Sequence, residues 1–338
     1  MTLIQRFYEI AKIQAEAKAL RFAVDGHPHD LPWWYYKSKV KHFALGLIDK
    51  GAQDNQYFYL LGPACPEWVF ANLAALSLGL RFIALPTDRA DLLPTLLKKY
   101  PPSFCFLSHE AYVPVADHIL KIHHFKQMIV LNEELKNKLP ASLTFREIFN
   151  LGIYQERQHF NAFNASRRSI TPQHLVSPLR FSSEYELIEQ PLYHEEINQK
   201  SAELVKRLKL GKKESLLFDQ DLAITDYLIL SIYWPILAGI QTIFLNPAYA
   251  YQENLRYSRP TMVFLRGNQI RQVFAAMESL LPKTPAHYFQ RWLTRQRFKT
   301  QLGRRIHTCI SLEPPDEDIQ GIFNLASIRH LMLPWAQD

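Results

Sequence analysis

The stretch YFYLLGPACPEWVFANLAALSLGLRFIAL, residues 57–85, decides the fold class of this 338-residue chain. Its apolar runs at 57–62 and 80–85 each have the length of a buried strand. The segment between them has the pattern of a helix that begins at Pro66 and ends at Gly79. Two strands joined by a helix indicate a parallel sheet, because parallel neighbours need a long crossover connection.

The same alternation continues on both sides of this stretch. We expect helices over residues 2–20, from Pro32 to Gly51, and over 268–281 and 286–302. A polar connector over roughly 152–172 interrupts the pattern, and strands and helices resume after it. The sequence therefore predicts an α/β protein of two lobes, 1–170 and 171–338, with mainly parallel sheets flanked by helices.

The composition is that of an ordinary globular protein. No run reaches the ~18 apolar residues of a membrane-spanning helix, so we expect a soluble, cytoplasmic chain. Glycine is scarce, with 11 residues, whereas proteins that bind nucleotides through glycine-rich loops usually contain more. The cysteines lie far apart and lack the spacing of metal ligands, so we expect no metal site; they are Cys65, Cys105 and Cys309.

Positive charge is concentrated in residues 279–312, which hold seven bases and no acid in a chain of net charge +7. An amphipathic basic helix in this segment, with Phe289 and Trp292 on one face, suits an acidic protein partner or an anionic membrane surface. The alternative is that the aromatic face packs on the second lobe and the bases are only solvated. No nucleic-acid recognition fold surrounds the segment, so we expect no nucleic-acid partner. The candidate anion or partner surface is Arg291, Arg295, Arg297, Lys299, Arg304 and Arg305.

A strand–turn–helix junction occurs at LRFSSEYELIEQPLYHEEI, residues 179–197. Such junctions often hold a phosphate, which needs glycines for close backbone approach and usually a Lys or Arg. Here no glycine occurs between Gly152 and Gly211, and no base occurs between Arg180 and Lys200. Acids fill the turn and its flanks instead: Glu184, Glu186, Glu189, Glu195 and Glu196. The pattern favours a solvated acidic turn over a nucleotide or metal site.

Several stretches, in order along nearly the whole chain, resemble adenylate-forming (AMP-binding) enzymes, and long-chain acyl-CoA synthetases most. Residues 43–88 follow an early pattern of that family, with Pro66, Glu67 and Trp68 in its PEW element. LAGIQTIFL (237–245) and RPTMVFL (259–265) are similar to two of its later strands. LGRRIHTCISLEPPDEDIQGIFN (302–324) is similar to a third. The resemblance implies the fold of the large N-terminal domain, ATP and Mg²⁺ as cofactors, and an AMP-forming acid–thiol ligase.

The departures from this family affect its functional motifs. The resemblance places its phosphate loop, YTSGTTGxPKG, on the 179–197 junction, where Ser182 and Ser183 match TS. Glu184, Tyr185, Glu186, Leu187 and Ile188 then replace glycines and hydroxyl residues, and the loop lysine falls on Ile188 or Gln190. SLEPP (311–315) and LPWAQD (333–338) stand where adenine and Mg²⁺ ligands are expected, and the C-terminal catalytic domain has no counterpart. The second lobe is therefore expected to be incomplete.

These departures predict a catalytically degenerate pseudoenzyme that binds a protein partner or an acyl chain. We expect no catalytic residue and no bound ATP or Mg²⁺; the degenerate phosphate-loop position is Ser182, Ser183, Glu184, Glu186 and Ile188. An alternative is the N-terminal piece of a split or truncated acyl-CoA synthetase, a fatty acid–CoA ligase. A further alternative is an active enzyme with altered phosphate chemistry.

Overall fold

A computed structural model describes the chain and divides it into two compact units. The described residues are 1–122, 125–131, 133–208, 210, 213–219, 221–246, 248–266, 269–270, 296–297, 300, 302–312 and 317–333. Unit 1 comprises Met1–Ala17, Pro32–Leu208 and Asp221–Gly239. Unit 2 comprises Lys18–Leu31, Lys209–Gln220 and Ile240–Asp338. The predicted boundary after residue 170 falls within the Pro32–Leu208 segment of unit 1.

The core of unit 1 is a parallel five-stranded sheet in the order β4-β3-β5-β6-β7. Its strands are β3 (Tyr57–Leu61), β4 (Arg81–Leu85), β5 (Pro102–Leu107), β6 (Gln127–Val130) and β7 (Leu143–Thr144). Phe58 lies between Phe82 on one neighbouring strand and Phe104 on the other. Every residue of β5 is buried, as the continuous apolar runs predict for a sheet covered on both faces.

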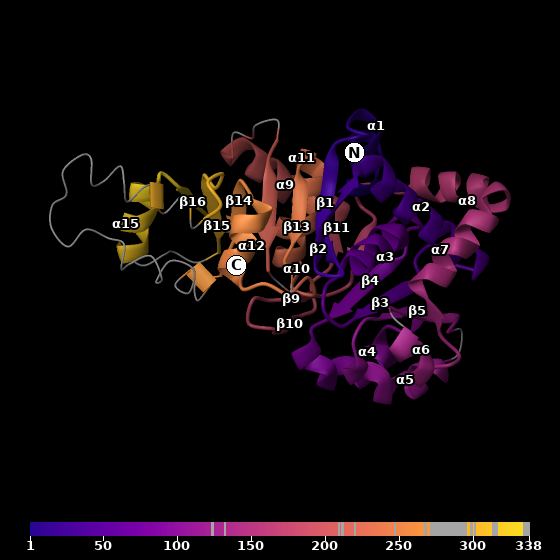
Figure 1. Ribbon diagram of the computed structural model, residues 1–338. Helices are drawn as coiled ribbons and strands as arrows, with labels where there is room; N and C mark the ends of the chain where they lie inside the picture. Colours follow the sequence, from indigo (N-terminus) through magenta and orange to yellow (C-terminus); the bar gives the residue numbers. More distant parts are fainter. Residues whose placement is uncertain are drawn as a thin grey trace, which may run out of the picture. The chain divides into compact units, whose positions relative to one another are not determined.

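Helices cover both faces of this sheet (Figure 1). Helices α4 (Leu93–Lys99), α5 (Val113–Leu120) and α6 (Glu133–Lys138) lie on one side. On the other lie α2 (Trp33–Asp49), α3 (Pro66–Ser77) and α7 (Phe145–Tyr154). Helix α3 is apolar all round, and its residues from Trp68 to Ser77 are buried.

The remaining elements of unit 1 come from its start and its second half. They are α1 (Leu3–Ile13), η1 (Thr87–Leu92), η2 (Glu110–Tyr112), α8 (Glu156–Ser169), α9 (His194–Arg207), α10 (Thr225–Leu228), η3 (Ile229–Tyr233) and α11 (Trp234–Ala238). Two short antiparallel pairs also belong here: β8 (Leu175–Ser177) with β11 (Leu192–Tyr193), and β9 (Arg180–Phe181) with β10 (Leu187–Ile188). The second pair carries the predicted phosphate-loop position.

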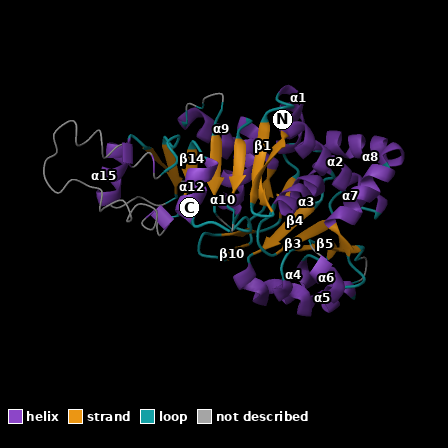
Figure 2. Ribbon diagram, viewed as in Figure 1, coloured by secondary structure: helices purple, strands orange, loops and turns teal. Residues whose placement is uncertain are grey.

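Unit 2 contains a seven-stranded sheet in the order β16-β15-β14-β12-β13-β1-β2. Its strands are β1 (Lys18–Val24), β2 (His27–Pro32), β12 (Ser215–Phe218), β13 (Gln241–Phe244), β14 (Met262–Phe264), β15 (Thr308–Ser311) and β16 (Arg329–Met332). The strand pairs from β16 to β1 are parallel (strands orange in Figure 2). Helices α12 (Tyr251–Ser258) and α15 (Glu317–Ala326) share one core with the sheet, where Leu255 and Phe323 join Val263. The predicted α/β class with mainly parallel sheets is confirmed.

Two segments differ from the sequence prediction. The predicted helix over 2–20 is wrong at its end, because α1 stops at Ile13 and Lys18–Val24 forms strand β1. The turn after β1 places Asp25 and Gly26 at φ values of 49° and 76°, a left-handed pair that a two-residue hairpin turn requires. The predicted polar connector contains helix α8, of which Phe163 is the buried residue.

Two further predictions concern the rest of the chain. The helices predicted at 268–281 and 286–302 fall almost entirely outside the described residues. In the part of the chain that the structure describes, no helix combines the length and apolar character needed to cross a membrane.

Candidate functional site

The predicted phosphate-loop position is the turn between β9 and β10. Leu187 pairs with Phe181, and Ile188 pairs with Arg180, so residues 182–186 connect two antiparallel strands. Ser182, Ser183, Glu184 and Glu186 thus lie together in one short turn, and Ile188 follows on β10 with 40% of its surface exposed.

This turn is closed by its own hydrogen bonds. The N–H of Tyr185 donates to the carbonyl oxygen of Ser182, and the N–H of Ser182 donates to that of Glu186, each at 3.0 Å. The Oγ of Ser182 accepts from the N–H of Glu184 at 3.2 Å and from the N–H of Glu186 at 3.1 Å. A phosphate-binding loop points such N–H groups at the anion. The four named here already have acceptors within the turn.

Tyr185 adopts a φ of 62° although it carries a β-carbon. The left-handed region costs a residue other than glycine roughly 1–2 kcal/mol. Nη1 of Arg89, in η1, donates to the carbonyl oxygen of Tyr185 at 2.5 Å and helps to hold this conformation. Nε of Arg89 contacts Asp91 at 3.2 Å, so its charge is partly compensated.

The acids around the turn are either exposed or paired with bases. Glu184 and Glu186 are exposed. Glu189 contacts Lys99 at 2.6 Å, and this hydrogen bond raises the pKa of Lys99. Partial burial opposes ionisation of Glu196, but the hydrogen bonds and charge of Arg180, with the charge of Lys200, outweigh it and lower the pKa of Glu196. Glu189 and Glu196 are thus balanced by bases, whereas Glu184 and Glu186 are exposed to solvent.

His194 is the first residue of helix α9. Its side chain is buried, and its Nδ1 has no hydrogen-bond partner among the described residues. Burial, with a smaller contribution from nearby His174, lowers the pKa of His194 to about 3. A neutral imidazole at neutral pH fits a structural role at the start of the helix.

The predicted basic surface is described only in part. Arg291, Arg295 and Lys299 lie outside the described residues. Arg297, Arg304 and Arg305 are exposed, and Nη2 of Arg305 donates to the carbonyl oxygen of Lys213 at 3.1 Å. In the described ranges, no group of three or more His, Cys, Asp or Glu side chains is arranged to hold a metal ion.

The turn does not fit a bound triphosphate. In the family that the sequence resembles, glycines allow the backbone to wrap the phosphates and a lysine balances their charge. Here Tyr185 occupies a left-handed position with a full side chain, and Glu184 and Glu186 present carboxylates from the same turn. The contact of Arg89 with Tyr185 was not expected from sequence, because 96 positions separate the two residues.

The fold matches that of solved adenylate-forming enzymes. The A domain of carboxylic acid reductase from Segniliparus rugosus, in complex with AMP and a co-purified carboxylic acid, superposes with a TM-score of 0.73 at 14% identity. The match covers 98% of this chain and 59% of that one. The chain has the fold of adenylate-forming enzymes. The predicted resemblance is confirmed at the level of the fold.

Two further structures support this assignment. The N-terminal domain of FACL13 from Mycobacterium tuberculosis has a TM-score of 0.70 at 12% identity, covering 98% of this chain and 74% of that one. The fatty acid AMP ligase from Legionella pneumophila has a TM-score of 0.64 at 16% identity, covering 97% and 53%. This chain thus spans between about half and three quarters of the length of these proteins. No family model and no curated protein sequence matches it.

Proposed function

We propose that this chain is a non-catalytic protein with the adenylate-forming fold, which acts by binding a protein partner or an acyl chain. The observation that carries the proposal is the β9–β10 turn. Its N–H groups at Ser182, Glu184, Tyr185 and Glu186 donate within the turn. An adenylating enzyme needs such groups for the β- and γ-phosphates of ATP.

Charge at the turn supports the same proposal. Glu184 and Glu186 would face the phosphates of a nucleotide placed as in the family. Each like-charge contact at about 4 Å costs on the order of 1 kcal/mol in water and about 4 kcal/mol at an effective dielectric of 20. Mg²⁺ could bridge one carboxylate and one phosphate, but it would not supply N–H donors. Adenylation depends mainly on positioning and on charge stabilisation, so these losses lower the rate by many orders of magnitude.

Calorimetric titration of the whole chain tests the proposal, with ATP·Mg²⁺, a fatty acid and a non-hydrolysable acyl-adenylate added separately. We expect no heat of binding from ATP·Mg²⁺ and no acid-dependent exchange of pyrophosphate into ATP. Exchange above background would overturn the proposal. If the fatty acid alone binds saturably, the chain binds an acyl group. If it does not bind, the proposal that the chain binds a protein partner remains.

A variant with residues 182–190 replaced by a Gly/Ser/Lys phosphate loop is the matched control. If the turn alone prevents nucleotide binding, this variant binds ATP·Mg²⁺ measurably while the wild type does not. We expect such binding without turnover. Turnover in the variant would contradict the non-catalytic assignment of the rest of the chain.

We further propose that the basic surface contacts an acidic protein partner. Arg297, Arg304 and Arg305 are exposed, and residues 279–312 contain no acid to neutralise them. Co-sedimentation with anionic and neutral vesicles at low and high salt tests the competing membrane interpretation. Each base near an anionic bilayer contributes about 1 kcal/mol. Salt-sensitive binding to anionic vesicles alone, lost when Arg291, Arg295, Arg297 and Lys299 are changed to Gln, would favour a membrane over a protein partner.

A further inference from the structure

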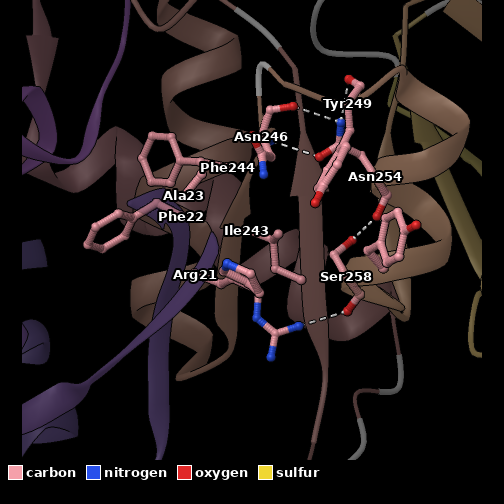
Figure 3. Close-up of a pocket in the computed structure, with 11 residues that line it drawn as sticks. Arg21, Phe22, Ala23, Ile243, Phe244, Asn246, Tyr249, Asn254 and Ser258 are labelled. Atoms are coloured by element: carbon pink, nitrogen blue, oxygen red, sulfur yellow. Dashed lines mark hydrogen bonds between the residues drawn. The ribbon is translucent and has the colours of Figure 1, made fainter. Parts of the chain in front are cut away.

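A small pocket in unit 2 lies between the β1–β2 hairpin and helix α12. Its volume is about 130 Å³, and it is partly open to solvent. Figure 3 shows Ile243 and the ring of Tyr249 on the side of α12, whereas the rings of Phe22 and Phe244 point to the other side of the sheet. The buried side chain of Ile243 and the small side chain of Ala23 also line it. The walls are thus mainly apolar, and their aromatic surface comes from Tyr249 and Tyr257.

The polar side chains around the pocket already form hydrogen bonds with other groups of this chain. Arg21 donates to both carboxylate oxygens of Asp30, at 2.7 and 2.9 Å, and to the carbonyl oxygen of Ser258 at 3.1 Å. Nδ2 of Asn246 donates to the carbonyl oxygen of Gly26 at 2.8 Å. Nδ2 of Asn254 donates to three carbonyl oxygens, including that of Tyr249 at 3.0 Å. A ligand here would therefore meet no charge that it has to neutralise.

Two tyrosines stand at the edge of the pocket with much of their surface in water. Tyr249 is 37% exposed and Tyr257 is 67% exposed, and their ring centroids are 4.9 Å apart at an angle of 31°. Large exposed aromatic side chains beside a hollow are typical of binding surfaces, because ring faces give contact area with few rotatable bonds. A flat ring that enters the pocket would meet aromatic side chains at its edge.

We propose that this pocket binds a small neutral compound with a single planar aromatic ring. An engineered cavity of about 150 Å³ lined by apolar side chains binds benzene, so a volume near 130 Å³ accommodates about one ring. A nucleotide or a long acyl chain is several times larger. The site is therefore separate in its chemistry from adenylation, and it does not depend on the proposed function of the chain.

Ligand-observed saturation-transfer NMR tests the site, with phenol as the probe and cyclohexanol as its saturated counterpart. We expect phenol to bind with a dissociation constant on the order of 1 mM, as its seven non-hydrogen atoms allow. We expect cyclohexanol to bind at least fivefold more weakly, because its puckered ring does not stack. Equal signals from the two compounds, or no signal from phenol at several times this concentration, would overturn the proposal.

Two variants locate the binding. Ala23→Met fills the pocket and should reduce phenol binding at least tenfold, whereas Ala17→Met makes the same change at an exposed position outside it and should have no effect. Tyr257→Ala removes part of the aromatic wall at a well-exposed position and should weaken binding severalfold. Thermal unfolding of each variant checks that it is folded. Phenol binding that is unchanged in both Ala23→Met and Tyr257→Ala would show that the probe binds elsewhere.

Discussion

Ser182 organises the β9–β10 turn through one oxygen atom. Its Oγ accepts from the N–H groups of Glu184 and Glu186. We expect Ser182→Ala to lower the free energy of unfolding by about 1 kcal/mol, because two N–H groups must then bond to water. Ser182→Thr keeps the oxygen and should remain close to wild type. Chemical denaturation measures both, and equal stability of all three proteins would contradict this account of the turn.

The free energy of unfolding depends on pH through His194, because the pKa of this side chain differs between the folded and unfolded states. Its pKa is lowered to about 3 in the folded state, against roughly 6.5 in an unfolded chain, so the unfolded state binds more protons between these values. The contribution of the neutral imidazole is therefore complete above about pH 6.5 and is lost as the pH falls. The loss amounts to about 1.4 kcal/mol per pH unit.

We expect the unfolding free energies of wild type and His194→Leu to diverge by about 2 kcal/mol between pH 6.5 and 5. Leucine does not titrate, so only the wild type loses the stability linked to this residue. Urea denaturation of the two proteins at matched pH values gives the difference. A difference that stays constant across this range would show that His194 is not the group responsible.

The position of the candidate turn could be predicted from the sequence, but its geometry could not. Ser182 and Ser183 match the family pattern, so the position of the turn could be predicted. The hydrogen bonds that close it could not, because they depend on a left-handed Tyr185 held by Arg89 from another element. A β-carbon makes that conformation unfavourable for an isolated residue, and only the surrounding structure stabilises it.

At the scale of elements, helices α2 and α7 approach each other closely at two glycines. A β-carbon added to Gly152 would lie 1.7 Å from the carbonyl oxygen of His42, and one added to Gly46 would lie 2.1 Å from that of Ile148. Both contacts are with backbone atoms, which cannot move aside as a side chain would. We expect Gly152→Ala to destabilise the protein by about 3 kcal/mol or more, or to prevent folding.

Gly321 in α15 provides the matched control, because a β-carbon there would meet nothing within 4 Å. Alanine is favoured over glycine in a helix by about 1 kcal/mol, so Gly321→Ala should be neutral or stabilising. Thermal unfolding compares the two substitutions. A stable, wild-type-like Gly152→Ala variant would mean that the helices do not pack at this distance.

The elements that could be predicted from the sequence are those with long apolar runs. Helix α3 and strands β3 and β4 were predicted because their apolar runs are long and are bounded by proline or glycine. The β1–β2 hairpin was missed although Asp25–Gly26 is a strong local turn signal. Helix α8 was missed because its composition is polar and Phe163 is its buried residue.

At the scale of the whole molecule, the two units are interleaved along the chain. Strand β1 pairs with β13 in the second half of the sequence, with Leu20 opposite Thr242. Residues 221–239 in turn belong to the first unit. No single cut separates the units, because each contains segments from both sides of residue 170, and an interleaved division of this kind leaves no signal in local composition.

We expect a fragment of residues 171–338, expressed alone, to lack cooperative unfolding. It lacks β1 and β2, so the backbone groups of β13 that pair with β1 would be exposed at a sheet edge. Co-expression with residues 1–170 should restore a soluble complex. Circular dichroism and thermal unfolding measure the outcome, and a sharp unfolding transition of the isolated fragment would show that its fold does not need the hairpin.

Because β1 pairs with β13, the N-terminal hairpin cannot complete its pairing until β13 has been synthesised on the ribosome. Leu20 emerges long before Thr242, its neighbour in the sheet. At a translation rate of about 5–20 residues per second, the interval is roughly 10 to 40 s. During this time the first hairpin has no permanent neighbour, and its free edge is a target for aggregation. An isolated two-stranded hairpin is at best marginally stable, so β1 and β2 gain a lasting place in the sheet only after β13 has been made.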